Sequence, residues 1–227
     1  MVPQSLGRGG EGSEGELMKE YHKIQSVFKR SEDGKKMLFG QYSLPEFEYL
    51  AENEWVFTEK VDGTNIRVMW QDGKVTFGGK TDNAQIPAFL VTRLQELFLN
   101  DAAIAKFKEK FPDGCCLYGE GYGAKIQKGG GNYKADGVDF VLFDVNVAGW
   151  WLLREDMEEI AVLFGIEPVP IIGRGTLPHM VAMAEAGFDS TWGPFKAEGI
   201  VAKPVTELRT RRDERIVTKI KAKDFAG

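Results

Sequence analysis

Cysteine and histidine are scarce in this chain of 227 residues. The two cysteines are the neighbours Cys115 and Cys116, and the two histidines, His22 and His179, lie far apart. Adjacent cysteines rarely close a disulfide, and these four residues form no zinc-ligand pattern. The scarcity excludes a disulfide-stabilised scaffold, and it predicts two buried thiols in a reducing, cytoplasmic compartment.

Long hydrophobic runs are also missing. No apolar stretch approaches the length of a membrane span and no signal peptide opens the sequence, so we expect no membrane association. The hydrophobic share of 43% is still enough for the core of one domain. Residues 1–16 are rich in Gly, Glu and Ser and have little to bury, which predicts a disordered tail ahead of a single domain over residues 17–227.

Charge of one sign does not dominate. The 29 basic and 34 acidic residues give a net charge of −5, which argues against wholesale wrapping of nucleic acid. Basic residues nevertheless gather near the C-terminal end of the sequence, and they are Lys203, Arg209, Arg211, Arg212, Arg215, Lys219, Lys221 and Lys223. Such a stretch either binds a polyanion locally or forms a solvated charged face.

Hydrophobic periodicity predicts a mixture of helices and antiparallel strands. Leu17, Tyr21, Ile24 and Phe28 recur at helical spacing and indicate a helix near the start of the domain. Further helices are expected within 89–111 and over 154–164 and 178–186. Strands are expected over 55–60, 64–70, 74–78, 115–122, 138–147, 198–203 and 215–221. Without a regular βαβ alternation, this order favours an α+β fold.

Polar residues interrupt the first of these strand pairs. Lys60, Asp62 and Asn65 stand where two half-buried strands join, and Gly63 permits a tight or left-handed turn after the carboxylate. A lysine amine that has lost its proton is a nucleophile, whereas an ordinary lysine at a strand edge discourages aggregation. The spacing alone leaves both interpretations open.

Three later stretches of the sequence carry charged residues on predicted strands. Glu120 stands between glycines on a strand, Glu198 opens an apolar strand, and Lys219 and Lys221 alternate so that they share a face. Carboxylates suit Mg²⁺, and ammonium groups complement phosphate. If these strands line one groove, the groove suits a nucleotide and its metal ion.

Five segments in this order resemble the covalent nucleotidyltransferases, the superfamily of polynucleotide ligases and mRNA capping enzymes. They are "KVDGTN" at 60–65, "YGEG" at 118–121, "VLFDV" at 141–145, "EGIVAK" at 198–203 and "KIK" at 219–221. The resemblance implies antiparallel sheets that form an ATP-binding groove flanked by helices. Asn65 replaces the arginine usual in DNA ligases and capping enzymes, which points to RNA ligases, and most closely to the phage-type branch that seals nicks in duplex RNA.

The resemblance also implies roles for individual residues. Lys60 would attack ATP and carry AMP, while Lys219 and Lys221 would neutralise the phosphate and help to keep Lys60 unprotonated. Glu198, with Asp62, would hold Mg²⁺ or Mn²⁺. The remaining expected nucleotide contacts are Glu120 at the ribose, Phe143 and Glu59 at the base, Asn65 in the first motif, and Lys80 near the ribose and α-phosphate, where many relatives carry arginine.

RNA 5′-phosphate and 3′-OH ends are the substrates that this resemblance implies, in a phage or bacterial host cell. The sequence ends soon after Lys221, without the C-terminal domain of many ligases. We therefore expect RNA to be bound by a separate partner protein or by the arginines Arg209, Arg211, Arg212 and Arg215. The alternatives are a minimal DNA ligase, a GTP-dependent capping enzyme and a non-catalytic RNA-binding relative.

Overall fold

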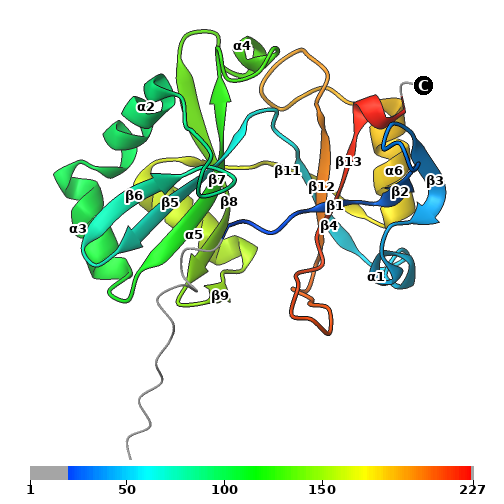
Figure 1. Ribbon diagram of the computed structural model, residues 1–227, viewed down its shortest axis with the longest axis horizontal. Coiled ribbons are helices and arrows are strands. Elements are labelled where there is room, and N and C mark those ends of the chain that lie inside the picture. Colours follow the sequence, from blue (N-terminus) through cyan, green and yellow to red (C-terminus); the bar gives the residue numbers. More distant parts are fainter. Residues whose placement is uncertain (1–19, 226–227) are drawn as a thin grey trace, which may run out of the picture.

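Two β-sheets, each with its own helices, make up the two lobes of the molecule (Figure 1), and residues of both line a cleft between them. The computed structural model describes residues 20–225. The tail predicted over residues 1–16 and the start of the predicted N-terminal helix lie outside these residues. None of the helices in the described range is long and apolar enough to cross a membrane.

The sheet of one lobe has the order β10-β8-β7-β5-β6, with β9 paired to β8. Its strands are β5 (Thr64–Gln71), β6 (Lys74–Gly78), β7 (Cys115–Gly123), β8 (Val138–Val147), β9 (Trp150–Trp151) and β10 (Glu167–Pro168). The helices of this lobe are α2 (Ala88–Phe98), α3 (Asp101–Lys110) and α5 (Arg154–Phe164), and a short α4 (Gly130–Tyr133) follows β7. The left side of Figure 1 shows this lobe.

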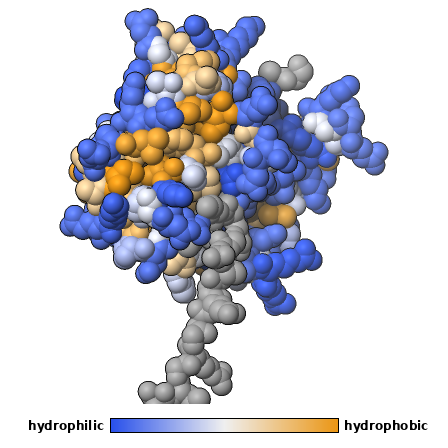
Figure 2. Space-filling view, turned by 60° about the vertical axis from the view of Figure 1, so that its left-hand side comes forward, coloured by the Kyte–Doolittle hydropathy of each residue, from blue (hydrophilic) through white to orange (hydrophobic). Residues whose placement is uncertain are grey.

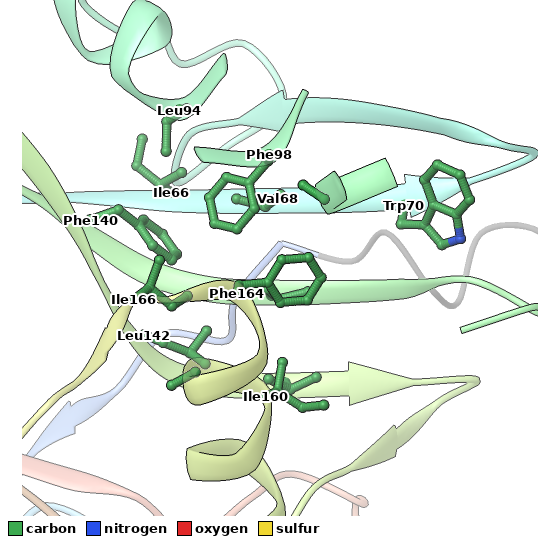
Figure 3. Close-up of a cluster of buried hydrophobic side chains, with 14 of the residues drawn as sticks. Ile66, Val68, Trp70, Leu94, Phe98, Phe140, Leu142, Ile160, Phe164 and Ile166 are labelled. Atoms are coloured by element: carbon green, nitrogen blue, oxygen red, sulfur yellow. The ribbon is translucent and has the colours of Figure 1, made fainter. Parts of the chain in front are cut away.

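The core of this lobe lies between the sheet and its helices. Ile66 and Val68 of β5 meet Leu94 and Phe98 of α2, and Phe164 of α5 closes the cluster (Figure 3). The alternation of β5 turns these residues toward the helices and leaves Asn65 to line the pocket on the other face. Figure 2 turns this lobe toward the reader and shows that hydrophobic residues also gather on part of its surface.

The sheet of the second lobe has the order β1-β13-β12-β4-β11. Its strands are β1 (Gln25–Ser26), β4 (Trp55–Glu59), β11 (Ile171–Gly175), β12 (Gly199–Pro204) and β13 (Thr218–Lys221). The elements around it are the hairpin of β2 (Phe28–Arg30) and β3 (Met37–Tyr42), the helices α1 (Pro45–Tyr49) and α6 (Leu177–Ala186), and a 3-10 turn at Ala222–Asp224. Trp55, Phe57 and Ile200 bury one face of the sheet in this lobe's core, which leaves the other face to the cleft.

The helices and strands predicted from residue 55 onward are confirmed to within a residue or two, except that the last strand begins at Thr218 and not at residue 215. Thr176 caps α6 by accepting a hydrogen bond from the His179 amide. The predicted helix through Tyr21, Ile24 and Phe28 is wrong over the described residues. That segment is extended, because Gln25 and Ser26 pair in parallel with Thr218 and Lys219 of β13. Short strands such as β10 and β11 had no clear pattern in the sequence.

Candidate functional site

Lys60 lies at one end of a chain of charges on the cleft side of the second lobe, in which Glu198 is the central member. Its Nζ is 2.6 Å from Glu198 Oε2, and Glu198 Oε1 is 2.5 Å from Lys221 Nζ. The sheet builds this contact, because the Lys60 amide donates to the Gly199 carbonyl and Gly199 pairs with Lys221. A Cβ on Gly199 would lie 2.2 Å from the Ile220 oxygen, so only glycine fits there.

Lys219 adds a further positive charge to this group. Burial, together with repulsion from Lys60, Lys221 and Lys80, lowers the pKa of its ammonium from 10.5 to about 8. Lys219 and Lys221 share a face of β13, as the alternation predicted. Several cations are thus held close together, which is an arrangement that an anion would stabilise.

Glu120 faces this cluster from β7 of the other lobe. Burial raises the pKa of its carboxyl from 4.5 to about 8, and the negative charges of Glu198 and Asp62 oppose its ionisation as well. The glycines that flank Glu120 point the other way: a Cβ on Gly119 would strike Phe140, and one on Gly121 would strike Leu90. They allow close approach of core side chains and not of a ligand.

Gly63 serves a purpose other than the predicted left-handed turn. Its φ is not among the positive values of the backbone. A Cβ on Gly63 would instead lie 2.3 Å from the Gly121 oxygen and 2.7 Å from Glu120 Cγ. Glycine therefore lets the loop after Lys60 pack directly on β7, which brings the two lobes together at the site.

A pocket opens beside Lys60 between the two sheets. Asn65 and Phe143 line it from the first lobe, and Val201 lines it from the second. The Asn65 Oδ1 atom is buried and has no hydrogen-bond partner among the described residues, so a donor on a bound molecule could satisfy it. Phe143 sits at a register shift between β7 and β8, and such irregularities re-aim a side chain.

The carboxylate of Glu59, which is expected at the base, is engaged within the protein. It touches the pocket, but it is buried and both carboxylate oxygens are engaged on the side away from Lys60. The Ser190 hydroxyl donates at 2.6 Å, and the amide and hydroxyl of Thr191 donate at 2.8 and 2.9 Å. Glu59 therefore anchors the loop at residues 190–191 to the strand that carries Lys60.

The structure places Asp62 and Lys80 at the margin of the site. The Asp62 amide donates to the Tyr133 hydroxyl at 3.2 Å, and the Asp62 carboxylate is close enough to influence Glu120. Lys80 is exposed after β6 and is near enough to repel Lys219. All the residues predicted for the site therefore lie around one cleft, although Glu59 points away from its centre.

A buried ionic network closes the other end of the pocket, and the sequence did not predict it. Asp144 Oδ2 accepts from Lys203 at 2.7 Å and from Arg215 at 2.8 Å, and it also accepts from the Tyr21 hydroxyl. These cations hold the pKa of Asp144 well below its usual range. Arg215 also binds Glu207, so the expectation that Arg215 grips RNA is wrong.

The donors around Lys60 fit a hydrated metal ion and not an all-protein metal cage. Among the described residues, no group of three or more His, Cys, Asp or Glu side chains could hold a metal. Mg²⁺ usually keeps several waters and binds one or two carboxylates together with phosphate oxygens. Glu198, with Asp62 nearby, supplies such a partial set.

Comparisons with known proteins give a family and a shared fold. The model of the RNA ligase family matches residues 53–221. A search of curated proteins gave no match.

Solved structures of Naegleria gruberi RNA ligase share the fold. An apo mutant has a TM-score of 0.61 at 20% identity, covering 93% of this chain and 59% of that one. A lysine-to-alanine mutant with ATP and Mn has a TM-score of 0.62 at 20% identity, and the match covers 94% of this chain and 61% of that one. The same ligase with PPi has a TM-score of 0.60 at 21% identity, and the match covers 99% of this chain and 63% of that one. The chain thus spans about 60% of the length of these structures.

Proposed function

The chain belongs to the RNA ligase family, and from this premise we propose that it joins RNA 5′-phosphate and 3′-OH ends at the expense of ATP, through AMP bound covalently to Lys60. The observation that carries the proposal is that Glu198 bridges Lys60 and Lys221, while Lys60 itself lines the pocket. A strand-edge lysine that only discourages aggregation would not need a carboxylate, two further lysines and a pocket beside it.

In the first step Lys60 Nζ attacks the α-phosphorus of ATP. The N–P bond forms as the bond from phosphorus to the pyrophosphate oxygen breaks, and pyrophosphate leaves with that electron pair. Lys60 attacks as the neutral amine, and the proton that its nitrogen loses as the N–P bond forms passes to solvent. Lys219 and Lys221 supply positive charge for the phosphate oxygens, where negative charge grows in the transition state.

Glu198 also gives the site its place for the divalent ion. When bound, Mg²⁺ or Mn²⁺ would neutralise phosphate charge and orient the leaving group. Glu198 is shared by Lys60 and Lys221 in this structure, and its carboxylate would also hold the ion. A structure of Naegleria gruberi RNA ligase contains both ATP and Mn.

The pocket supplies the groups that adenosine requires. Phe143 and Val201 line it from opposite sheets, so a flat base fits between them. Glu120, with its raised pKa, is protonated at neutral pH before the nucleotide binds and can then both donate and accept hydrogen bonds at the ribose. Asn65 offers its unsatisfied oxygen at the same end. Glu59 supports this pocket through the 190–191 loop.

The later steps consume RNA. The RNA 5′-phosphate oxygen attacks the phosphorus of the Lys60 adduct, the N–P bond breaks, and RNA capped with AMP results. The 3′-OH then attacks the RNA 5′-phosphorus, AMP leaves, and a phosphodiester forms. Asn65 favours RNA over the alternatives of a minimal DNA ligase or a GTP-dependent capping enzyme. The nick in duplex RNA, the phage-type branch and a partner that adds grip are parts of this proposal.

The test offers labelled ATP, GTP and NAD with Mg²⁺, followed by nicked duplexes with RNA or DNA on each side of the nick. We expect labelling by ATP alone, and faster sealing when the 3′-OH end is RNA, because a 2′-OH both donates and accepts hydrogen bonds. Labelling by GTP would support a capping enzyme. Equal sealing of every duplex would overturn the RNA assignment, and absence of any label would support a non-catalytic relative.

A further inference from the structure

A second groove lies on the outer side of the two active-site lysines, between the β2–β3 hairpin and β13. Lys219, Lys221 and Lys223 line one wall of it. The other wall is the hairpin, which Figure 1 places beside β13 at the edge of the second lobe. The backbone links the two walls, because the Val27 amide donates to the Lys219 carbonyl.

Positive charge dominates this groove. Among the described residues that line it, Asp224 is the single carboxylate, and it is neutralised by Arg30 at 2.6 Å. The cationic side chains that line it are Lys23, Lys29, Arg30, Lys35, Lys36, Lys219, Lys221 and Lys223.

Several of these cations lack a protein partner. Within residues 20–225, the ammonium groups of Lys29, Lys35, Lys36 and Lys223 form no ion pair, and each of these side chains is exposed. A surface that only needed solubility would mix charges of both signs, as most of this acidic chain does. A concave surface of one sign concentrates a counter-charge instead.

The groove also offers an aromatic platform. Phe39 is 48% exposed, and its ring stacks on Phe225 with centroids 4.8 Å apart and an interplanar angle of 24°. Phe28 meets the same ring edge-on at 5.9 Å. The Phe39 ring is therefore held in place while part of it faces solvent. Lysines interleaved with an exposed, fixed ring are the combination that binds a strand of nucleic acid through phosphates and one stacked base.

We propose that this hairpin groove binds the phosphodiester backbone of the RNA substrate, with a base stacked on Phe39. The proposal rests on the proposed function, because it concerns the substrate of that same site. Lys219 and Lys221 line the groove and also surround Lys60, so a strand held here has its end at the nucleophile. The RNA is thus bound mainly at the hairpin, and not at Arg209, Arg211 and Arg212 in the loop between β12 and β13.

The outer phosphates of ATP are the competing occupant, since they too are anions near Lys219. They would explain cations close to Lys60, but not the exposed ring of Phe39 or lysines on a separate hairpin. A single triphosphate also has no use for an aromatic platform. These observations favour a chain of nucleotides.

The experiment uses the full chain with Lys29→Gln, Lys35→Gln and Lys36→Gln combined, and separately Phe39→Ala. The matched control removes three charges from α3 of the other lobe, with Lys106→Gln, Lys108→Gln and Lys110→Gln. Fluorescence anisotropy measures binding of a nicked RNA duplex as salt is varied, and labelled ATP measures formation of the protein–AMP adduct.

The groove triple variant should bind the duplex roughly tenfold more weakly, and the slope of log affinity against log salt should fall by about 2–3. Phe39→Ala should weaken binding about tenfold with little change in that slope, because stacking is not ionic. The adduct should form as in the wild type in both variants. The control should match the wild type in binding and slope.

Two results would overturn the groove assignment. One is RNA binding by the triple variant with the affinity and salt slope of the wild type. The other is unchanged RNA binding together with a raised requirement for ATP, which would give the groove to the triphosphate. Failure of the proposed function itself looks different: the wild type would then form no adduct with ATP, whatever its affinity for RNA.

Discussion

Glu120→Gln should make the stability of the protein less sensitive to pH. The carboxyl of Glu120 has a pKa of about 8 in the folded protein against 4.5 ordinarily, mainly because burial disfavours its charge. A folded-state pKa above the unfolded value gives stability that is fully present below pH 4.5 and is lost as pH rises through 8. Glutamine cannot ionise, so the variant escapes this loss.

The size of the effect follows from the same shift. Between pH 5 and pH 8 the variant should gain on the order of 2–4 kcal/mol in free energy of unfolding relative to the wild type, since each pKa unit corresponds to about 1.4 kcal/mol. Urea unfolding at a series of pH values measures this difference, and other titrating groups cancel in the comparison. Glu185→Gln, at an exposed position on α6, is the control and should show no such trend. A constant difference between Glu120→Gln and the wild type across this range would refute the reasoning.

Other expected outcomes concern the buried network, the metal and the base. Arg215→Met should cost about 3–5 kcal/mol of stability in urea, because it removes a buried cation that both Asp144 oxygens contact, whereas Arg209→Met at an exposed pair should cost less than about 1 kcal/mol. Glu198→Gln should lose most adduct formation at saturating ATP, with only partial recovery at high Mg²⁺; an unchanged rate and metal dependence would contradict its role. Phe143→Ala should raise the KM for ATP by about tenfold in the labelling assay, and an unchanged KM would place the base elsewhere.

The strands that carry the site could be predicted because their signals are local. Alternation placed Lys219 and Lys221 on one face of β13, and it also places Val56 and Thr58 on the cleft side of β4. The same alternation separates Glu59 from Lys60, since neighbouring residues on a strand point to opposite faces. A direction for the Glu59 side chain that differs from that of Lys60 could therefore have been predicted from the sequence alone.

Contacts between residues far apart in the sequence determine the features that could not be predicted. The segment from Tyr21 to Phe28 has helical spacing, but its backbone pairs with β13 at the other end of the domain. Arg215 looks like one more solvated charge until Asp144, 71 residues earlier, is placed beside it. The lysines of the hairpin and those of β13 likewise form one groove only after β1 has joined the two ends of the domain.

The most direct measurement of the central claim is the mass and location of the AMP adduct. Purified protein is incubated with ATP and Mg²⁺, its intact mass is measured, and the modified peptide is sequenced, alongside Lys60→Ala and Lys80→Ala. The account predicts one AMP on Lys60 in the wild type and in Lys80→Ala, and none in Lys60→Ala, which should remain folded. An adduct that persists in Lys60→Ala, or that maps to Lys219 or Lys221, would contradict it.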